Sequence, residues 1–455
     1  MITIKKGLVL LLALLLTLFL GTVVMGAETS ERGYFGTDYD FGGETVTFWN
    51  WGDWLFERFE EGEIAEGRVE EAEELFNVNI EFEVILPQDR IETYTSRLLA
   101  GESTHDVWHA ANRVGYYELL AIGGLYPLSD ILPEEYYDGL RRDTIVPIET
   151  MAYQGKKYAL GSPAATYGID TDFIIRDLYF MYYNKDMIEE AGLPDPYDLY
   201  REGDWTYETF TELAREVTTD TTGDGDIDQY GMQNIGWMYE QWPHTNNGNF
   251  IEEQDGEYVV TLDLPENREA ILQLREWGEV EEITGGNFAQ GTAAFITQGL
   301  WMIESWMEGD GALDFNFGIV PKPMGPHADE NLVARHSLDT WVIPINSAQP
   351  EAKVALHEFL FWDDEETVSA QFQRELPDLF PERRYAELAI NESREWDGVG
   401  TFIKPGEVED LIRTGSQGWA QHGINAVIMD NMEWSTMVDE VEPLIQAVLD
   451  DFFDQ

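Results

Sequence analysis

Residues whose type and spacing could bind a metal occur in an acidic loop at residues 220–231. Side chains that carry oxygen recur there at alternate positions: Asp220, Thr222, Asp224, Asp226 and Asp228. The spacing matches the first nine positions of an EF-hand loop, and calcium takes such hard oxygen ligands. However, Gly231 stands where position 12 would supply a bidentate glutamate. The sequence therefore allows two interpretations of this loop: it binds a structural calcium ion, or it is a metal-free Asp-Gly turn held by Asx hydrogen bonds.

Motifs of covalent or metal-dependent catalysis do not occur in the sequence. It has no nucleophile elbow, no HExxH zinc motif and no phosphate-binding glycine loop. It has no cysteine, which excludes disulfides, thiolate metal sites and cysteine nucleophiles. The sequence therefore contains no positive sign of a catalytic site, and no cofactor is expected beyond the possible calcium ion.

The elements that would position the acidic loop are a strand and two helices. The apolar run from Leu178 predicts a buried strand that ends at Asn184, which can cap a helix at residues 185–191, and Gly192 can take the left-handed position after it. A second helix is predicted to open at Thr206 and to bury one face: Tyr207, Phe210, Leu213, Ala214 and Val217.

Strands and helices alternate through the rest of the chain in the same way. Strands are predicted at 45–48, 78–84 and 106–110, and helices at 69–76, 91–99, from Pro350 onward and at 438–452. Such alternation predicts an α/β protein with parallel or mixed sheets flanked by helices. The length of 455 residues predicts more than one domain.

The charge of the chain is extremely acidic. There are 88 Asp and Glu against 27 Lys and Arg, and the formal net charge is −61. Nucleic acid is excluded as a partner because its phosphates need a basic face. Disorder is excluded because 44% of the residues are hydrophobic and 13% aromatic. An acidic surface with only 8 lysines against 19 arginines predicts a protein that works in high salt, where the self-repulsion is screened.

The N-terminus has the order of a secretory signal peptide. Lys5 and Lys6 precede an apolar run at 7–20, and small residues follow at Gly26 and Ala27. Residues 1–27 are therefore predicted to be a signal peptide, and an uncleaved membrane anchor is the alternative. The exported protein should be periplasmic or extracellular, and it cannot be a cysteine-linked lipoprotein. Residues 28–42 are predicted to be a flexible leader.

A series of short motifs in the same order resembles the extracellular solute-binding proteins of ABC importers, in the maltose-binding-protein-like branch that takes up sugars. They include Glu44–Trp51, Leu98–Trp108, Gly123–Asp130, the segment 178–231 and Phe317–Pro323. Each motif is weak alone, but their shared order over residues 44–365 is specific.

The resemblance implies a periplasmic-binding-protein type II fold, with two α/β lobes and a ligand cleft between them. By analogy, the first lobe takes residues 43–162 and 298–340, and the second takes 163–297 and 341–455. The implied protein is a monomer that captures a sugar or oligosaccharide by hinge closure and delivers it to a membrane permease. A secreted carbohydrate-active hydrolase with paired carboxylates is the alternative.

The resemblance also places candidate ligand-binding residues at the cleft. A sugar needs aromatic platforms for its apolar faces and polar groups for its hydroxyls. The candidates are Trp49, Trp51, Asp53, Asp106, Trp108, Asn112, Trp237, Trp242, Asn247, Trp301, Arg335 and Trp341. For each tryptophan, packing in the core is the alternative, and Asp106 could brace its strand end.

Overall fold

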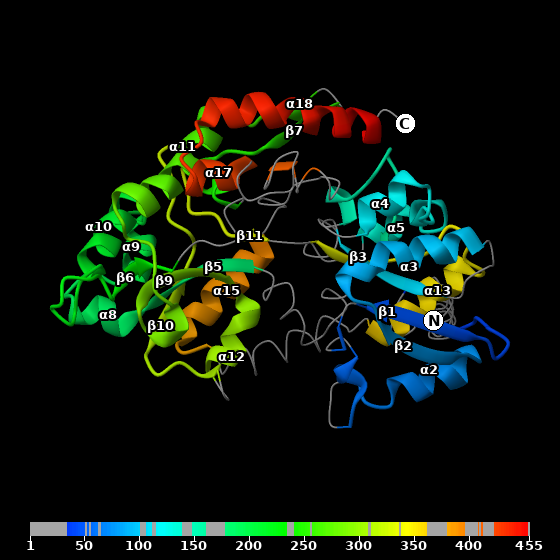
Figure 1. Ribbon diagram of the computed structural model, residues 1–455. Coiled ribbons are helices and arrows are strands. Elements are labelled where there is room, and N and C mark those ends of the chain that lie inside the picture. Colours follow the sequence, from blue (N-terminus) through cyan, green and yellow to red (C-terminus); the bar gives the residue numbers. More distant parts are fainter. Residues whose placement is uncertain are drawn as a thin grey trace, which may run out of the picture.

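We examined the protein as a computed structural model. The described residues are 34–50, 52–53, 56–61, 65–100, 106–111, 115–138, 148–160, 178–233, 241–254, 257–307, 311–335, 338–361, 380–395, 408, 411–412 and 423–453. Figure 1 shows two lobes with a helix lying across one end of both. Within the described residues, no helix has the length and apolarity needed to cross a membrane.

The first lobe is built on a five-stranded mixed sheet in the order β2-β1-β3-β12-β4. Its strands are β1 (Thr45–Asn50), β2 (Asn79–Val84), β3 (Val107–Ala111), β4 (Ala159–Leu160) and β12 (Asp339–Val342). The strands β1, β2 and β3 are parallel, whereas β12 runs antiparallel between β3 and β4. The strands predicted at 45–48, 78–84 and 106–110 are thereby confirmed.

Helices cover both faces of this first sheet. They are α2 (Arg68–Phe76), α3 (Pro87–Ala100), α4 (Tyr116–Ala121), α5 (Glu134–Asp138) and α13 (Pro350–Phe361), with short 3-10 turns η1 (Glu57–Phe59) and η2 (Leu128–Asp130). On one face, Tyr94 of α3 stacks on Trp108 with ring centroids 4.4 Å apart. On the other face, Phe361 of α13 lies 5.5 Å from Trp341, centroid to centroid.

The second lobe is built on a sheet in the order β10-β5-β9-β6, in which β11 also pairs with β5. Its strands are β5 (Leu178–Asn184), β6 (Tyr230–Met232), β9 (Ala293–Gly299), β10 (Phe317–Val320) and β11 (Ala334–Arg335), and a separate hairpin joins β7 (Ile251–Gln254) to β8 (Glu257–Val260). Every residue of β5 is buried, as its apolar sequence predicts.

The helices of the second lobe begin as the sequence predicts. In α8 (Lys185–Glu190), the Asn184 side chain accepts a hydrogen bond from the Met187 backbone, and Gly192 is left-handed. In α10 (Tyr207–Val217), Thr206 is the N-cap, and the five predicted residues are buried. Burial of Phe210, Leu213 and Val217 contributes about 1.5–3 kcal/mol each. The sequence analysis missed α9 (Pro196–Glu202), which Asp195 caps.

The remaining helical elements surround this sheet and the hairpin. They are η4 (Pro243–Asn246), α11 (Pro265–Arg275), η5 (Glu276–Val280), η6 (Phe288–Gln290), η7 (Leu300–Met302), α12 (Ile303–Met307), α15 (Arg383–Glu395), α17 (Gly423–Met429) and α18 (Trp434–Phe453). The helix predicted at 438–452 is the body of α18. Trp277 of η5 is completely buried against Phe210 and Trp242, with centroids 4.7 and 5.2 Å away.

Strand pairing divides the lobes differently from the predicted boundaries. The segment 298–340 was predicted to lie in the first lobe, but β10 and β11 pair with β5 in the second sheet. The chain returns to the first sheet only at β12. Helix α13, predicted for the second lobe, packs in the first through Phe361 and Phe48. The sequence pattern shows that a strand exists but not which sheet it joins, which is why these boundaries were wrong.

The predicted flexible leader is in part a packed segment of the first lobe. Phe41 is buried, and its backbone N–H donates to the Phe76 carbonyl at 2.9 Å. The Tyr34 N–H donates to Glu358 Oε2 at 2.8 Å, and its ring lies 5.6 Å from that of Tyr136. The aromatic residues of 34–41 fix the segment to the lobe, whereas residues 28–33 of the predicted leader and the predicted signal peptide lie outside the described residues.

The C-terminal helix α18 lies across one end of the molecule and spans both lobes (Figure 1). Its body binds the second-lobe hairpin, because the Val260 N–H donates to Gln446 Oε1 at 3.0 Å. Its last turn reaches the first lobe, where the Tyr153 hydroxyl donates to the Phe452 carbonyl at 2.8 Å. The Phe452 ring also lies 5.6 Å from that of Tyr117. Any movement of the lobes must therefore accommodate this contact.

Candidate functional site

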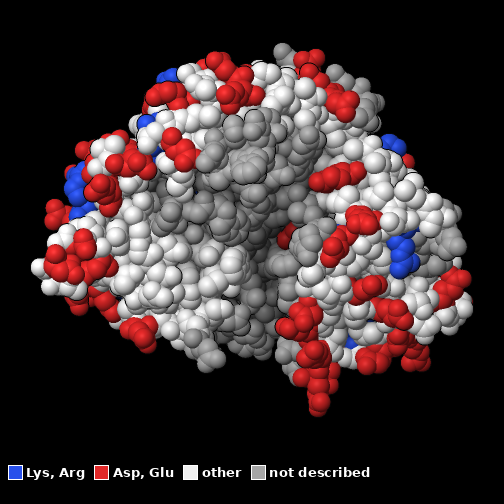
Figure 2. Space-filling model, in the orientation of Figure 1, with Lys and Arg blue, Asp and Glu red and all other residues white. Residues whose placement is uncertain are grey.

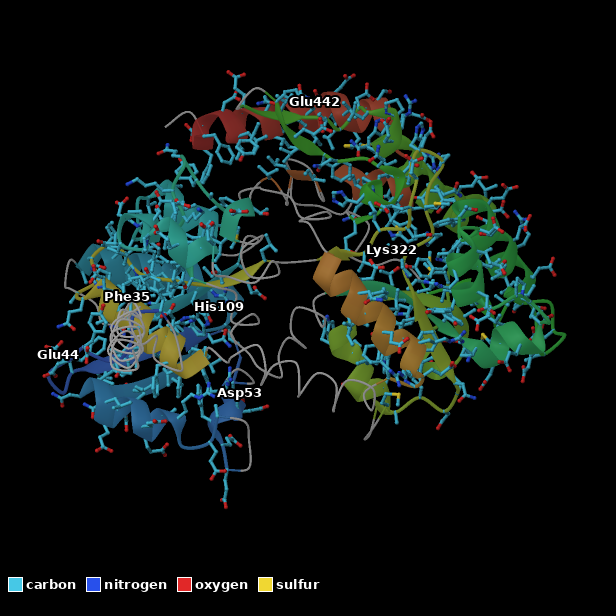
Figure 3. The ribbon with its side chains drawn as sticks, turned by 180° about the vertical axis from the view of Figure 1, so that it is seen from behind. Phe35, Glu44, Asp53, His109, Lys322 and Glu442 are labelled. Atoms are coloured by element: carbon cyan, nitrogen blue, oxygen red, sulfur yellow. The ribbon has the colours of Figure 1, made fainter. Side chains whose placement is uncertain are left out.

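The candidate site is the groove between the lobes, which Figure 2 shows as a deep hollow. Figure 3 places Asp53 and His109 on the side of the first lobe that faces the second, and Glu44 on the far side. Glu44 precedes β1 and Asp53 follows it, so the carboxyl ends of the parallel strands β1 and β3 face the groove. Ligands of open α/β sheets bind outside the carboxyl ends of strands.

The first-lobe wall of the groove is polar. Asn50 ends β1, is buried and donates from Nδ2 to the Gly52 carbonyl at 2.9 Å, while Asp53 is exposed. Asp339 begins β12 opposite Ala111, the last residue of β3. One carboxylate oxygen of Asp339 lies 3.7 Å from Nε2 of His109, whose ring is buried. Burial lowers the pKa of His109 well below its usual value, so the ring is neutral.

The second-lobe wall combines an aromatic platform with a buried cation. Trp301 follows the end of β9 and is 41% exposed, unlike its buried neighbour Leu300. Its indole N–H points at the Tyr179 hydroxyl, at 3.5 Å. Lys322 follows β10, lies on the side facing the first lobe (Figure 3) and donates to Gln241 Oε1 at 2.9 Å. Tyr179, Lys322 and Gln241 are all buried at this strand edge.

Four predicted platform tryptophans are core residues instead. Trp49, Trp108, Trp242 and Trp341 are each at most 1% exposed. Trp49 and Trp108 stack with Tyr94 of α3, with centroids 5.7 and 4.4 Å away. Trp242 packs against Trp277, and Trp341 against Phe48, 5.8 Å away. Trp49, Trp108 and Trp341 lie in strands that point alternate residues into covered faces, and Trp242 precedes η4. All four rings belong to the cores of the lobes and present no face to the groove.

Asp106 was predicted at the ligand site but lies at the opposite edge of the first sheet. It precedes β3, whose carboxyl end faces the groove, so Asp106 lies five positions before Ala111, the last residue of that strand. Its charge acts there on Lys353 of α13, together with that of Glu44. The carboxylate therefore belongs to a buried polar cluster behind the sheet, which corresponds to the bracing role weighed as the alternative.

Comparison with known proteins places this fold and groove in a family. The sequence matches the family described as bacterial extracellular solute-binding protein over residues 59–362. The chain belongs to this family. The fold and the family are those of solute-binding proteins that are not enzymes, and they give the hydrolase alternative no support.

Solved structures share the fold of this solute-binding protein at low sequence identity. The maltose/maltodextrin-binding domain MalE from Bdellovibrio bacteriovorus, bound to maltotriose, is 16% identical, with a TM-score of 0.58 over 89% of this chain and 99% of that one. A sugar transporter from Rhizobium etli in an open conformation is 16% identical, with a TM-score of 0.62 over the same shares. An ABC substrate-binding protein from Listeria monocytogenes in complex with cycloalternan is 15% identical, with a TM-score of 0.59 over 89% and 98%.

The other predicted site residues of this solute-binding protein fall into two groups. Trp51, Asn112 and Trp237, together with the side chain of Arg335, lie outside the described residues. Asn247 is exposed and left-handed, with a φ of 60°, where it ends η4. Of the twelve predicted residues, the structure thus brings Asp53 and Trp301 to the two facing edges of the groove.

The sequence analysis missed Tyr179, Gln241 and Lys322. Tyr179 was read only as part of a buried strand, although it lies at the strand end where the groove begins. Lys322 carried a signal that could have been used, because lysine is rare in this chain and this one stands between two prolines directly after a strand. Gln241 carried no signal in the sequence.

The acidic loop forms a turn in which its carboxylates accept backbone hydrogen bonds. Asp220 accepts from the Gly225 N–H at 2.7 Å and from the Gly223 N–H at 2.6 Å, and these bonds lower its pKa. Asp228 accepts from the Thr221 N–H at 2.8 Å. Among the described residues, no group of three or more acidic or histidine side chains is close enough to hold a metal. The calcium ion stays a prediction, and the loop lies apart from the groove edges.

Proposed function

We propose that this solute-binding protein captures a sugar or oligosaccharide in the groove between its lobes. The observation that carries the proposal is the exposed Trp301 indole, which lies beside Tyr179 at the strand edge where Lys322 also contacts Tyr179. Figure 3 shows Lys322 on the side of the second lobe that faces the first. An indole face binds the apolar face of a sugar ring, while carboxylates and amides bind its hydroxyls. Relatives of the same fold bind maltotriose and cycloalternan, which supports this ligand class.

Binding is proposed to close the lobes around the sugar. A ligand that contacts both groove walls favours the closed form because only that form makes all contacts at once. The closed monomer would then deliver the sugar to the permease subunits of an ABC importer. The family is extracellular, which supports export, with residues 1–27 acting as the signal peptide or as a retained anchor.

The protein is also proposed to work in high salt. Figure 2 shows acidic side chains over both lobes and few basic ones. Each described lysine is held within the fold: Lys156 pairs with Asp130, Lys157 with Glu134 and Lys185 with Glu382, whereas Lys322 and Lys353 are buried. Salt screens the repulsion among the remaining charges over about 8 Å or less.

A thermal-shift screen of sugars in molar NaCl tests the proposed function. A sugar present at 100 times its Kd should stabilise the protein by about 2.7 kcal/mol. Maltotriose, cycloalternan, tagatose and ribitol form the first panel. An absence of any shift across mono- and oligosaccharides would contradict the proposal. An assay for new reducing ends separates it from a hydrolase, because a binding protein releases no product in excess of its own amount.

A further inference from the structure

A buried polar network lies directly behind the first-lobe wall of the groove. Its members come from four elements: Arg90 of α3, Glu118 of α4, His109 of β3 and Asp339 of β12. Arg90, His109 and Asp339 are 2%, 0% and 8% exposed. Buried charges are costly unless they are paired, so the presence of buried Arg90 and Asp339 in one network requires a reason.

The register of the sheet places Asp339 at the edge of the groove. Asp339 faces Ala111, the last residue of β3, and Trp341 faces His109 two positions deeper. Ala111 also forms a bridge with Gly115, and a Cβ on Gly115 would lie 3.5 Å from Cδ of Arg90. The Arg90 side chain therefore runs beneath the strand end from which Asp339 projects. The Asp339 side chain keeps 11% of its surface exposed, whereas that of His109 keeps 1%.

The groups around Asp339 at that edge are Arg90 and three other titratable side chains: His109, Glu118 and Tyr94. Burial lowers the pKa of Arg90, whereas the negative charges of Asp339 and Glu118 raise it. The positive charge of Arg90 therefore interacts with both carboxylates. His109 presents Nε2 to Asp339 at 3.7 Å, but the nearby Arg90 and its own burial keep its ring neutral. Glu118 Oε2 accepts a hydrogen bond from the Gly115 N–H at 3.0 Å. Tyr94, the remaining titratable group of α3 here, donates its hydroxyl proton to the His109 carbonyl at 2.8 Å.

We infer that Asp339 binds hydroxyl groups of the ligand and that Arg90 is a positioning residue that holds its carboxylate toward the groove. The inference rests on the proposed function and adds the class of ligand. A carboxylate accepts hydrogen bonds from hydroxyls and repels another carboxylate or a phosphate. The ligand is therefore a neutral, hydroxyl-rich sugar and not a sugar acid or sugar phosphate.

Calorimetric titrations with matched neutral and acidic probes test the role of Asp339. The probes are maltotriose and its aldonic acid maltotrionate, and ribitol and ribonate, each in molar NaCl. Wild-type protein should bind the neutral member of a pair at least tenfold more tightly. The D339N variant should bind the neutral sugar about ten- to a hundredfold more weakly, because a hydrogen bond to a charged group is lost. It should also lose most of its preference for the neutral sugar.

The change of preference separates ligand contact from a structural role. A variant that merely distorts the wall would weaken both members of a pair alike. The matched control is D130N, which removes the exposed partner of Lys156 in the same lobe and should leave both affinities unchanged. Positioning by Arg90 is tested by R90Q and R90K. R90Q should weaken the neutral sugar, R90K should restore part of the affinity, and adding R90Q to D339N should cause no further loss.

The outcomes separate this inference from the proposed function. If wild-type protein binds a neutral sugar but D339N binds it equally well, Asp339 is not a ligand-binding residue and the inference is wrong. If wild-type protein binds neither maltotriose nor ribitol, the proposed function fails for these sugars, and the inference fails with it. Thermal unfolding of D339N, R90Q and the double variant provides a readout without sugar. If the fall in Tm of the double variant equals the sum of the falls in the two single variants, Arg90 and Asp339 do not act as one network and the inference is wrong. If the double variant falls no further than the less stable single variant, the network is supported.

Discussion

Both lobes bury aromatic side chains, but the first lobe also buries many charged ones and the described part of the second lobe buries few. Seven Lys, Arg, Asp or Glu residues are buried in the described part of the first lobe: Arg58, Arg68, Arg90, Asp106, Asp339, Lys353 and Glu358. In the described part of the second lobe, Lys322 is the only one. There, the charged pairs Arg384–Asp195, Lys185–Glu382 and Arg215–Glu281 remain partly exposed.

Because the first lobe buries more charged side chains than the described part of the second lobe, we expect its stability to depend more strongly on pH than that of the second lobe. Neighbouring residues of α13 have pKa values displaced in opposite directions by burial: that of His357 is lowered to about 3, and that of Glu358 is raised to about 7. Lys353, also in α13, has its pKa lowered to about 7. The second-lobe core is instead a cluster of Trp and Phe rings around Trp277, which do not titrate.

The largest expected effect is in this aromatic core. Trp277→Ala removes a completely buried ring and the hydrogen bond from its Nε1 to Thr211 Oγ1 at 2.7 Å. It should lower the free energy of unfolding by about 3–5 kcal/mol, by the same amount at pH 5 and pH 8. Denaturant unfolding in molar NaCl measures this cost. If the loss in free energy of unfolding caused by Trp277→Ala changed strongly with pH, the expectation that the second-lobe core does not respond to pH would be wrong.

A pH-dependent effect is expected in the first lobe at Glu358. Burial raises its pKa in the folded protein from the ordinary value of 4.5 to about 7. Between these values the unfolded chain ionises while the folded one stays protonated, so wild-type stability is lost as pH rises from 4.5 to 7. The loss is on the order of 3 kcal/mol. The glutamine of Glu358→Gln does not titrate. As pH rises from 4.5 to 7, the free energy of unfolding of the variant should therefore increase relative to that of the wild type by the same amount. Parallel stability curves for the two proteins would contradict the assignment.

A smaller effect, on affinity alone, is expected at Trp301. Trp301→Ala should weaken sugar binding about ten- to a hundredfold, or about 1.4–2.7 kcal/mol, and should change the free energy of unfolding by less than about 1 kcal/mol. Tyr34→Ala is the matched control, because both rings are 41% exposed and Tyr34 lies outside the groove. If the Trp301 variant and the wild type bind the sugar with equal affinity, Trp301 does not contact the ligand and the proposed second-lobe part of the site is wrong.

The smallest effect is expected for an exposed ion pair of the second lobe. Arg215 and Glu281 are 2.7 Å apart at the closest, with the arginine side chain 53% exposed. Glu281→Gln should cost less than about 1 kcal/mol in low salt and nothing measurable in molar NaCl. A cost that persisted in molar salt would show that exposed charges also stabilise the second lobe.

Sequence patterns predicted the elements of the fold but not how strands assemble. The apolar face of α10 and the caps at Asn184 and Thr206 follow from local rules, and the structure confirms them. The apolar face predicted for α18 is confirmed in part, because Leu444 is exposed. Helix α9 was missed although Asp195 followed by Pro196 is a strong start signal. The lobe boundaries were wrong because pairings such as β10 with β5 join residues far apart in the chain.

The candidate site was predicted less well because residue type does not reveal direction. Trp108 and Trp301 are the same residue type near strands, yet one is 0% and the other 41% exposed. A strand points alternate residues to opposite faces, and only tertiary packing decides which face is covered. Asp106 was misplaced for a related reason, since the sequence does not show which end of β3 faces the groove.

The central claim is that a sugar binds between the lobes and closes them. Small-angle X-ray scattering of the protein in molar NaCl tests both parts in one titration with maltotriose, cycloalternan, tagatose and ribitol. The account predicts that the radius of gyration falls with one of these sugars and saturates at one sugar per protein. An unchanged radius of gyration with every sugar of the panel, up to millimolar concentration, would contradict it.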